Sequence, residues 1–271
     1  MNYTQPPIVL VFAGHDPTGG AGICADIQAL ASQGCHTAPI ITSITTQDTR
    51  NVFENKPLSS TLVAAQAEAV LADLPIAACK IGLLGSIEII EAVQHLLLKH
   101  PHLPVVVDPV LVAGGGYSLT QDKVRDAMIK KLLPLTQIIT PNSPEASALT
   151  GITNSLNAAA TRLMDYGCQH VCITGTHEDT PLVKNTLYSH GQQIQSWTWT
   201  RLPHSYHGSG CTFAASLAGF LAQGIDMVTA VYKAQHYTWT TLQRGFKPGH
   251  GQALPNRLFF NQEAQTEVVN W

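Results

Sequence analysis

Near its N-terminus the chain reads Ile8-Val9-Leu10-Val11-Phe12-Ala13-Gly14-His15-Asp16-Pro17-Thr18-Gly19-Gly20-Ala21-Gly22-Ile23-Cys24-Ala25-Asp26. The apolar run Ile8–Ala13 predicts a buried strand, and a helix that carries Asp26 is expected to begin near Ala21. Four glycines fall within the nine residues that join the two elements. Such a joint allows a ligand to approach the backbone closely, and the alternative is a plain strand-to-helix turn. Its spacing fits neither a phosphate loop nor a dinucleotide fingerprint.

The same alternation of short apolar runs with amphipathic stretches continues along most of the chain. It is typical of β-α-β units that build a mainly parallel sheet with helices on both faces. The expected strands are Ile8–Ala13, Thr37–Ile44, Ala78–Leu83, Val105–Asp108, Gln137–Thr140 and His170–Thr174. The expected helices are Ala21–Gln33, Ser60–Leu74, Ile87–Lys99, Asp122–Leu133, Pro144–Leu149, Leu156–Tyr166, Cys211–Ala222 and Met227–Leu242. A hairpin of Asn185–Ser189 and Gln193–Trp199 is expected to add an antiparallel edge. We therefore predict one α/β domain over residues 1–271.

Composition limits the possible partners. With 271 residues, of which 45% are hydrophobic, the chain can bury a sizeable core. A net charge of -3 and 15 lysines plus arginines, without a basic run, predict no nucleic acid and no membrane as partner. The first apolar run is too short for a signal peptide or a membrane span, so a cytoplasmic location is expected. Six cysteines without a CxxC pair argue against a disulfide framework or a zinc site.

Polar and small residues follow the expected strands at their carboxyl ends, where open parallel sheets bind ligands. Asp108 ends one strand, and a carboxylate there can address Mg²⁺ or phosphate. The amide of Gln47 suits the edge of a heteroaromatic ring, unless Gln47 is simply an exposed loop residue. Thr174 and Gly175 either line phosphates or turn the chain.

A second motif, Thr140-Pro141-Asn142-Ser143-Pro144-Glu145, begins a helix. Asn142 is a typical helix cap, Pro144 suits the first turn, and Glu145 is favoured near the positive helix end. Capping alone explains this motif. The functional alternative is that Asn142 and Glu145 hold a hydrated magnesium ion.

The junction His207-Gly208-Ser209-Gly210-Cys211 directly precedes an apolar run of helical character. Its glycines allow backbone N–H groups to turn inward, and the positive end of the following helix favours an anion. Cys211 falls in or beside the first turn, where the same potential is expected to lower the pKa of its thiol. The alternative is a glycine-rich turn with Cys211 as a small buried hydrophobe.

Taken together, these motifs resemble the ribokinase-like superfamily, and most closely the hydroxymethylpyrimidine and phosphomethylpyrimidine kinases of thiamine biosynthesis. The family pattern A-G-x-D-P-x-G-G-A-G-I-x-A-D matches residues 13–26, and Q-x-T-x-x-V matches residues 47–52. The patterns K-I-G-M/L, T-P-N-x-x-E and H-G-[ST]-G-C match residues 80–83, 140–145 and 207–211. The resemblance covers most of the chain. It implies a three-layer α/β/α fold with a mainly parallel central sheet.

The resemblance also implies an activity: MgATP would phosphorylate the hydroxymethyl group of 4-amino-5-hydroxymethyl-2-methylpyrimidine, a small-molecule substrate. Gln47 would hydrogen-bond the pyrimidine in a pocket shaped by Gly14, Ala21, Leu83 and Val110. A homodimer is expected by the same resemblance.

The catalytic group implied by the resemblance gathers around the glycine-rich junction. Cys211 would be the base or the positioning group at the hydroxymethyl. The backbone N–H groups of residues 208–211 would stabilise charge on the transferred phosphoryl group. These N–H groups, including that of Ser209, would form an anion hole. The metal ligands would be Glu145 and Asp108, directly or through water. The ATP and phosphate contacts would come from Asn142, Thr174, Gly175, Gly208 and Gly210.

The chain departs from the family where a K-G-G-H segment usually stands, because it has Thr174-Gly175-Thr176-His177. The loop Ala113-Gly114-Gly115-Gly116 also lacks a lysine that is common in the family. Losing a cation weakens phosphate stabilisation, so we expect phosphorylation of the monophosphate to suffer more than the first step. Two alternatives remain: a pyridoxal-type kinase, and a catalytically weakened pyrimidine-binding protein.

Overall fold

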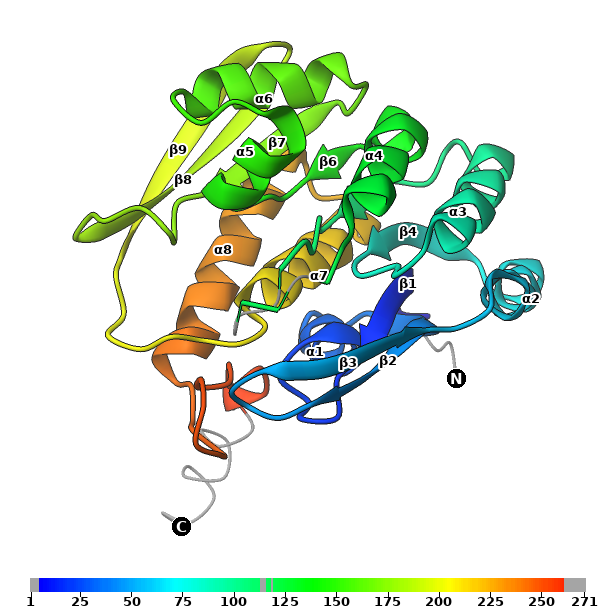
Figure 1. Ribbon diagram of the computed structural model, residues 1–271, viewed down its shortest axis with the longest axis horizontal. Coiled ribbons are helices and arrows are strands. Elements are labelled where there is room, and N and C mark those ends of the chain that lie inside the picture. The colour runs from blue at the N-terminus through cyan, green and yellow to red at the C-terminus, as the bar shows by residue number, and fades with distance from the viewer. Residues whose placement is uncertain (1–4, 113–115, 118, 261–271) are drawn as a thin grey trace.

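Nine strands form one sheet in the computed structural model, which describes residues 5–112, 116–117 and 119–260 (Figure 1). Their order across the sheet is β3-β2-β1-β4-β5-β6-β7-β8-β9. The strands are β1 (Ile8–His15), β2 (His36–Gln47), β3 (Val52–Pro57), β4 (Ile76–Ile81), β5 (Val105–Val107), β6 (Ile138–Ile139), β7 (His170–Thr174), β8 (Leu182–Ser189) and β9 (Gln192–Thr200). All pairings from β2 through β7 are parallel, which confirms the predicted mainly parallel sheet.

Both edges of the sheet are antiparallel. The predicted hairpin is confirmed as β8 and β9, and its turn residues His190 and Gly191 have φ of 50° and 74°, as a tight hairpin turn requires. The other edge strand, β3, pairs with β2 and was not predicted from the sequence. Half of its residues 52–57 are polar or charged and only Val52 is buried, so no hydrophobic alternation marks it.

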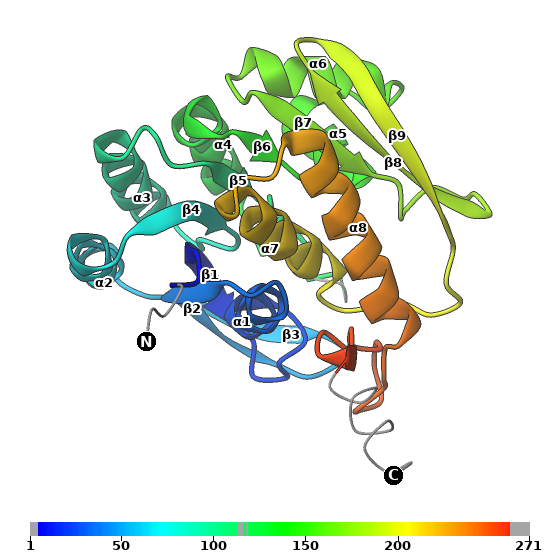
Figure 2. The ribbon, with the colours of Figure 1, turned by 180° about the vertical axis from the view of Figure 1, so that it is seen from behind.

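The helices cover both faces of this sheet, as Figures 1 and 2 show from opposite sides. One core joins the sheet to the helices α2, α3, α4, α5 and α6, and the other joins it to α1, α7 and α8. Alternate residues of β1 divide between the two cores, with Leu10 and Phe12 on one side and Val9 and Val11 on the other. The bounds are α1 (Gly22–Ser32), α2 (Ser60–Asp73), α3 (Ile87–Lys99), α4 (Asp122–Lys131), α5 (Ser143–Thr150), α6 (Leu156–Asp165), α7 (Ser209–Ala222) and α8 (Met227–Gln243), with a 3-10 turn η1 at Leu133–Leu135.

The stretch after Lys247 shows no periodicity in the sequence, and in the structure it packs against the glycine-rich junction. Single bridges join Ala253 to Tyr206 and Leu254 to Phe246. The following Arg257 is 2% exposed. Among the described residues, no helix has the length and apolarity to span a membrane.

Candidate active site

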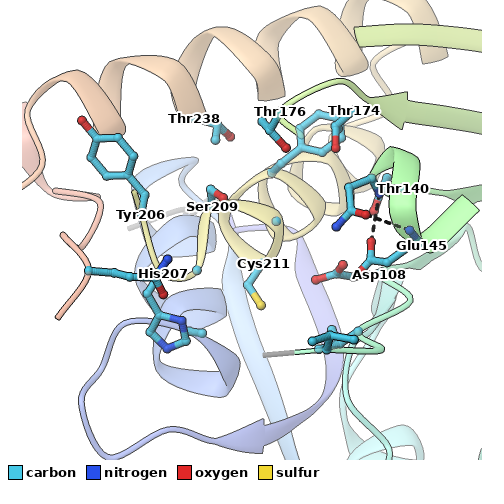
Figure 3. A pocket seen from close by; sticks show the side chains of 18 of the residues that line it. Asp108, Thr140, Glu145, Thr174, Thr176, Tyr206, His207, Ser209, Cys211 and Thr238 are labelled. Atoms are coloured by element: carbon cyan, nitrogen blue, oxygen red, sulfur yellow. Dashed lines mark hydrogen bonds between the residues drawn. The ribbon is translucent and has the colours of Figure 1, made fainter. Parts of the chain in front are cut away.

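A cavity of about 730 Å³ lies along the carboxyl ends of the parallel strands (Figure 3). It brings together nearly all the residues predicted to form the site, from segments far apart in the chain. They are Gly14, Ala21, Gln47, Leu83, Asp108, Val110, Asn142, Glu145, Thr174, Gly208, Ser209, Gly210 and Cys211. The predicted residue that does not line the cavity is Gly175.

The glycine-rich junction forms the start of α7. Gly208 is the N-cap with φ of 85°, and no side-chain hydrogen bond caps the helix. A Cβ at Gly208 would overlap the carbonyl oxygen of Gly20, so glycine is required where the two glycine-rich segments meet. Residues 212–221 of α7 are all buried. The helix is therefore fixed in the core, and its uncapped N–H groups and positive end face the cavity, where they favour an anion.

Asp16 and His207 join the glycine-rich crossover to this junction. Asp16 accepts hydrogen bonds from the backbone N–H groups of Thr18 and Ala21, each at 2.8 Å, and its Oδ2 lies 2.8 Å from His207 Nε2. Burial opposes ionisation of Asp16, but hydrogen bonds from His207 and Thr18 outweigh it and lower the pKa of the carboxyl to about 2. The carboxylate is thus a stable link between the two segments.

Cys211 lies in the first turn of α7, as predicted, but its thiol is not activated. Burial raises the pKa of the thiol to about 12; Lys80 opposes this, and the charges of Asp108 and Asp26 add to it. The expected lowering of this pKa is therefore wrong, because loss of water outweighs the helix dipole. The thiol is protonated and donates a hydrogen bond to Asp108.

Figure 3 shows the carboxyl group of Asp108 between the Cys211 thiol and Glu145. Asn142 and Glu145 form a reciprocal capping box, in which Glu145 Oε2 accepts from the Asn142 N–H at 2.9 Å and Asn142 Oδ1 accepts from the Glu145 N–H at 2.8 Å. Burial, and then the charge of Asp108, raise the pKa of Glu145 to about 8. Asp108 Oδ2 is buried and has no hydrogen-bond partner among the described residues. The carboxyl groups of Asp108 and Glu145 therefore have too little positive charge nearby to offset the rise in their pKa values that burial causes.

The predicted pyrimidine side of the cavity is formed at the ends of β1, β2 and β4. Gln47 is half-buried at the last position of β2, where a register shift interrupts the pairing with β3. A Cβ at Gly14 would lie 2.7 Å from Ser43 Oγ, so the backbone here packs closely against β2. Of the predicted glycine loop, residues 113–115 lie outside the described residues, and Gly116 lines the cavity.

Thr174 and Gly175 differ in their position relative to the cavity. Thr174 ends β7 and lines the cavity. Gly175 turns the chain away: its N–H donates to Asn185 Oδ1 at 3.1 Å, and a Cβ there would overlap the carbonyl oxygen of Lys184. Thr176 and His177 line the cavity beyond it.

Comparison with known proteins fits this arrangement. The sequence profile of the phosphomethylpyrimidine kinase family matches residues 16–256. The chain belongs to this family. A hydroxymethylpyrimidine/phosphomethylpyrimidine kinase of Haemophilus influenzae is 37% identical, over 94% of this chain and 97% of the relative. A thiamine biosynthesis bifunctional protein of Geobacter sulfurreducens is 34% identical over 95% of this chain and 53% of the relative.

The solved structures similar to this phosphomethylpyrimidine kinase family member include a vitamin kinase of another name. The pyridoxal kinase of Staphylococcus aureus in complex with ADP has a TM-score of 0.85 and 31% identity, over 94% of this chain and 95% of that chain. This likeness confirms the predicted ribokinase-like α/β/α fold.

The sequence interpretation assigned no role to Lys80 of the family motif at residues 80–83. Its ammonium lies 3.0 Å from Asp26 Oδ2, and both side chains are fully buried. Lys80 also lines the cavity. A lysine inside an otherwise apolar strand was the available signal, since an isolated buried charge is costly and requires a partner.

Arg257 was missed altogether, and no local pattern marks it. Its guanidinium donates to the carbonyl oxygens of Gly19 and Gly20, to Gln28 Oε1 at 3.2 Å and to Thr212 Oγ1 at 2.9 Å. It thereby joins the glycine-rich crossover to the first turn of α7. Three of its partners come from the N-terminal part of the chain and Thr212 lies 45 residues before it, so only the folded structure brings them together.

The other end of the cavity, away from Gln47, is lined by aromatic and amide side chains of β9 and α8. Gln235, Thr238 and Trp239 of α8 line the cavity here. Gln235 Oε1 accepts from Trp199 Nε1 and from Asn185 Nδ2, each at 2.9 Å. The Trp199 and Trp239 rings lie 6.0 Å apart.

Proposed function

We propose that this protein transfers the γ-phosphoryl group of ATP to the hydroxymethyl group of 4-amino-5-hydroxymethyl-2-methylpyrimidine in thiamine biosynthesis. The observation that carries the proposal is that the uncapped start of α7 and the amide of Gln47 open into one cavity. The names of the sequence relatives support the same substrate. The monophosphate is proposed as a second, slower substrate, because Thr174 stands where the family usually has a lysine.

The transfer requires positioning and charge stabilisation more than covalent chemistry from the protein. The substrate hydroxyl oxygen forms a bond to the γ-phosphorus, the bond from that phosphorus to the bridging oxygen of ADP breaks, and the hydroxyl proton passes to water. The N–H groups of residues 208–211 stabilise charge on the phosphoryl oxygens. Because the Cys211 thiol is protonated before ligands bind, we assign it the role of positioning the hydroxymethyl group.

Asp108 and Glu145 fit a magnesium ion. Oxygen ligands are those that Mg²⁺ prefers, and it is usually held by one or two carboxylates plus substrate phosphates. The unpartnered Asp108 Oδ2 and the raised pKa of Glu145 both indicate a place where a cation would lower the electrostatic cost. When bound, the ion would neutralise charge on the phosphates of ATP.

Pyridoxal phosphorylation is the alternative favoured by the structural likeness to the Staphylococcus aureus enzyme. Both substrates present a hydroxymethyl group on a heteroaromatic ring, so the same hole serves either. Gln47 favours the pyrimidine, since its amide both donates to and accepts from an aminopyrimidine edge.

A homodimer is proposed as the assembly. The antiparallel ribbon of β2 and β3 exposes two large apolar side chains, Ile44 at 50% and Phe53 at 61%, which a second copy would cover. The cytoplasmic location stays a prediction.

Rates of ADP formation with the pyrimidine, its monophosphate and pyridoxal test the proposal. We expect the highest kcat/KM for the pyrimidine and a lower value for the monophosphate. A higher kcat/KM for pyridoxal would replace the proposed substrate. Binding of the pyrimidine without ADP formation would support the weakened binding protein instead.

A further inference from the structure

Lys80 projects from the centre of the sheet toward the face that carries the start of α7. On β4, Cys79 and Ile81 belong to the core under α2 and α3, whereas Ala78 belongs to the core under α1 and α7. Side chains alternate along a strand, so Lys80 shares the side of Ala78. Its partner Asp26 comes from α1 on that same side, at 3.0 Å.

This buried ion pair is incompletely satisfied. Lys80 Nζ donates to Asp26 Oδ2, and Asp26 Oδ1 has no hydrogen-bond partner among the described residues. A Cβ at residue 82 would lie 2.7 Å from Lys80 Nζ, so Gly82 leaves the room that the ammonium occupies. Replacing such a pair by apolar residues is often neutral or stabilising. Stability alone therefore does not account for Lys80.

Lys80 lines the same cavity as Asp108, which follows β5, and Cys211 on α7. Burial opposes the charge of its ammonium, but electrostatic attraction, that of Asp26 above all, raises the pKa of Lys80. The positive charge of Lys80 in turn lowers the pKa values of Asp108 and Cys211, although burial raises them by more. Arg257 also acts on Asp26 and Cys211, but its donors are directed at Gly19, Gly20, Gln28 and Thr212.

We propose that Lys80, anchored by Asp26, is a positioning residue for phosphoryl transfer that supplies fixed positive charge in the cavity shared by Asp108, Cys211 and the start of α7. This inference rests on the proposed kinase function. A buried cation acts through a medium of low dielectric, so its field reaches the transferred group without direct contact.

The decisive variant replaces the whole pair, Lys80→Met with Asp26→Leu. If the pair is only structural, the double variant regains both stability and kcat, because no charge is left buried alone. If Lys80 is a positioning residue, the double variant has a free energy of unfolding in urea close to that of the wild type. Its kcat with saturating MgATP, however, falls on the order of 10- to 100-fold. KM for the pyrimidine changes less than about 3-fold, since Gln47 and its pocket are untouched.

Two matched single variants decide the matter if the double variant does not fold. Lys80→Gln and Asp26→Asn each remove one charge from the same pair. A structural pair predicts equal losses of kcat, whereas the positioning role predicts a loss about 10-fold greater for Lys80→Gln. Equal losses would overturn the inference.

Lys99→Met is the control for removing a lysine, because Lys99 forms an exposed pair with Glu68 at 4.0 Å, with side chains 52% and 57% exposed. Its kcat should equal that of the wild type. A wild-type protein that does not phosphorylate the pyrimidine would refute the proposed function, whereas an active wild type with a fully active double variant would refute only the role of Lys80.

Discussion

Arg257→Met should cost both stability and activity, because Arg257 joins two segments that form the hole. The guanidinium is 2% exposed and donates to the carbonyl oxygens of Gly19 and Gly20, to Gln28 and to Thr212. Hydrogen bonds to a charged group contribute about 1.5–3 kcal/mol each, but burial of the ion offsets much of the total. The partners of Arg257 are neutral oxygens, and each buried acceptor left without a donor costs about 1–3 kcal/mol, so truncation should cost about 3–5 kcal/mol in all.

A loss of that size is a large part of the roughly 5–15 kcal/mol that stabilises a domain. The variant should therefore remain folded at 25 °C but unfold at a clearly lower urea concentration. Loosening of the crossover against α7 should also displace the hole, and a misplacement of about 1 Å can reduce the rate on the order of 100-fold. We expect kcat/KM for the pyrimidine to fall by about that factor.

The assay combines urea unfolding followed by circular dichroism with initial rates of ADP formation. Arg201→Met is the stability control, since Arg201 also donates to three carbonyl oxygens, those of Thr176, Thr180 and Glu178, but is solvent-exposed in these bonds. Its loss should cost about 1 kcal/mol or less. Equal costs for the two arginine variants, or a destabilised Arg257→Met protein with unchanged kcat/KM, would refute the reasoning.

Three further substitutions test other parts of the site. Gly208→Ala should lower kcat at least about 100-fold, because its φ is 85° and a Cβ there would overlap the crossover. The control is Gly224→Ala, where φ is 76° and a Cβ would meet nothing within 4 Å. This control should lose only about 1–3 kcal/mol of stability and keep its kcat. Asp16→Asn should weaken the dependence of the free energy of unfolding on pH in the acid range. The wild-type carboxyl, whose pKa falls from 3.8 to about 2 on folding, stabilises the protein above pH 3.8 and loses that contribution as the pH drops through about 2. Urea titrations between these two pH values measure the difference. Gln47→Ala should raise KM for the pyrimidine about 10-fold, as loss of about 1.4 kcal/mol of hydrogen bonding implies, and an unchanged KM would remove the argument for pyrimidine over pyridoxal.

Much of the fold follows from local patterns in the sequence. The parallel strands are short apolar runs, and α3 begins and ends where predicted, at Ile87 and Lys99. The edge strand β3 was not predicted, because its formation depends on pairing with β2 rather than on its own residues. Intrinsic strand preference is weak compared with such context.

The site was predicted in its composition but not in its electrostatics. Local sequence marked a helix start with glycines at residues 208 and 210 and a thiol at residue 211, and the family resemblance gave these residues their predicted role. The pKa of Cys211 was not predicted correctly, because it depends on burial and on Lys80, Asp108 and Asp26, which come from other elements. Arg257 escaped for the same reason, since each of its contacts spans 45 residues or more.

The identity of the phosphorylated product tests the central claim most directly. Wild-type protein is incubated with MgATP and 4-amino-5-hydroxymethyl-2-methylpyrimidine, and the reaction is followed by phosphorus NMR. The account predicts a phosphomonoester signal, coupled to the methylene protons of the pyrimidine, that grows in step with ADP. Formation of ADP with inorganic phosphate alone, or no ADP although the pyrimidine binds, would contradict it.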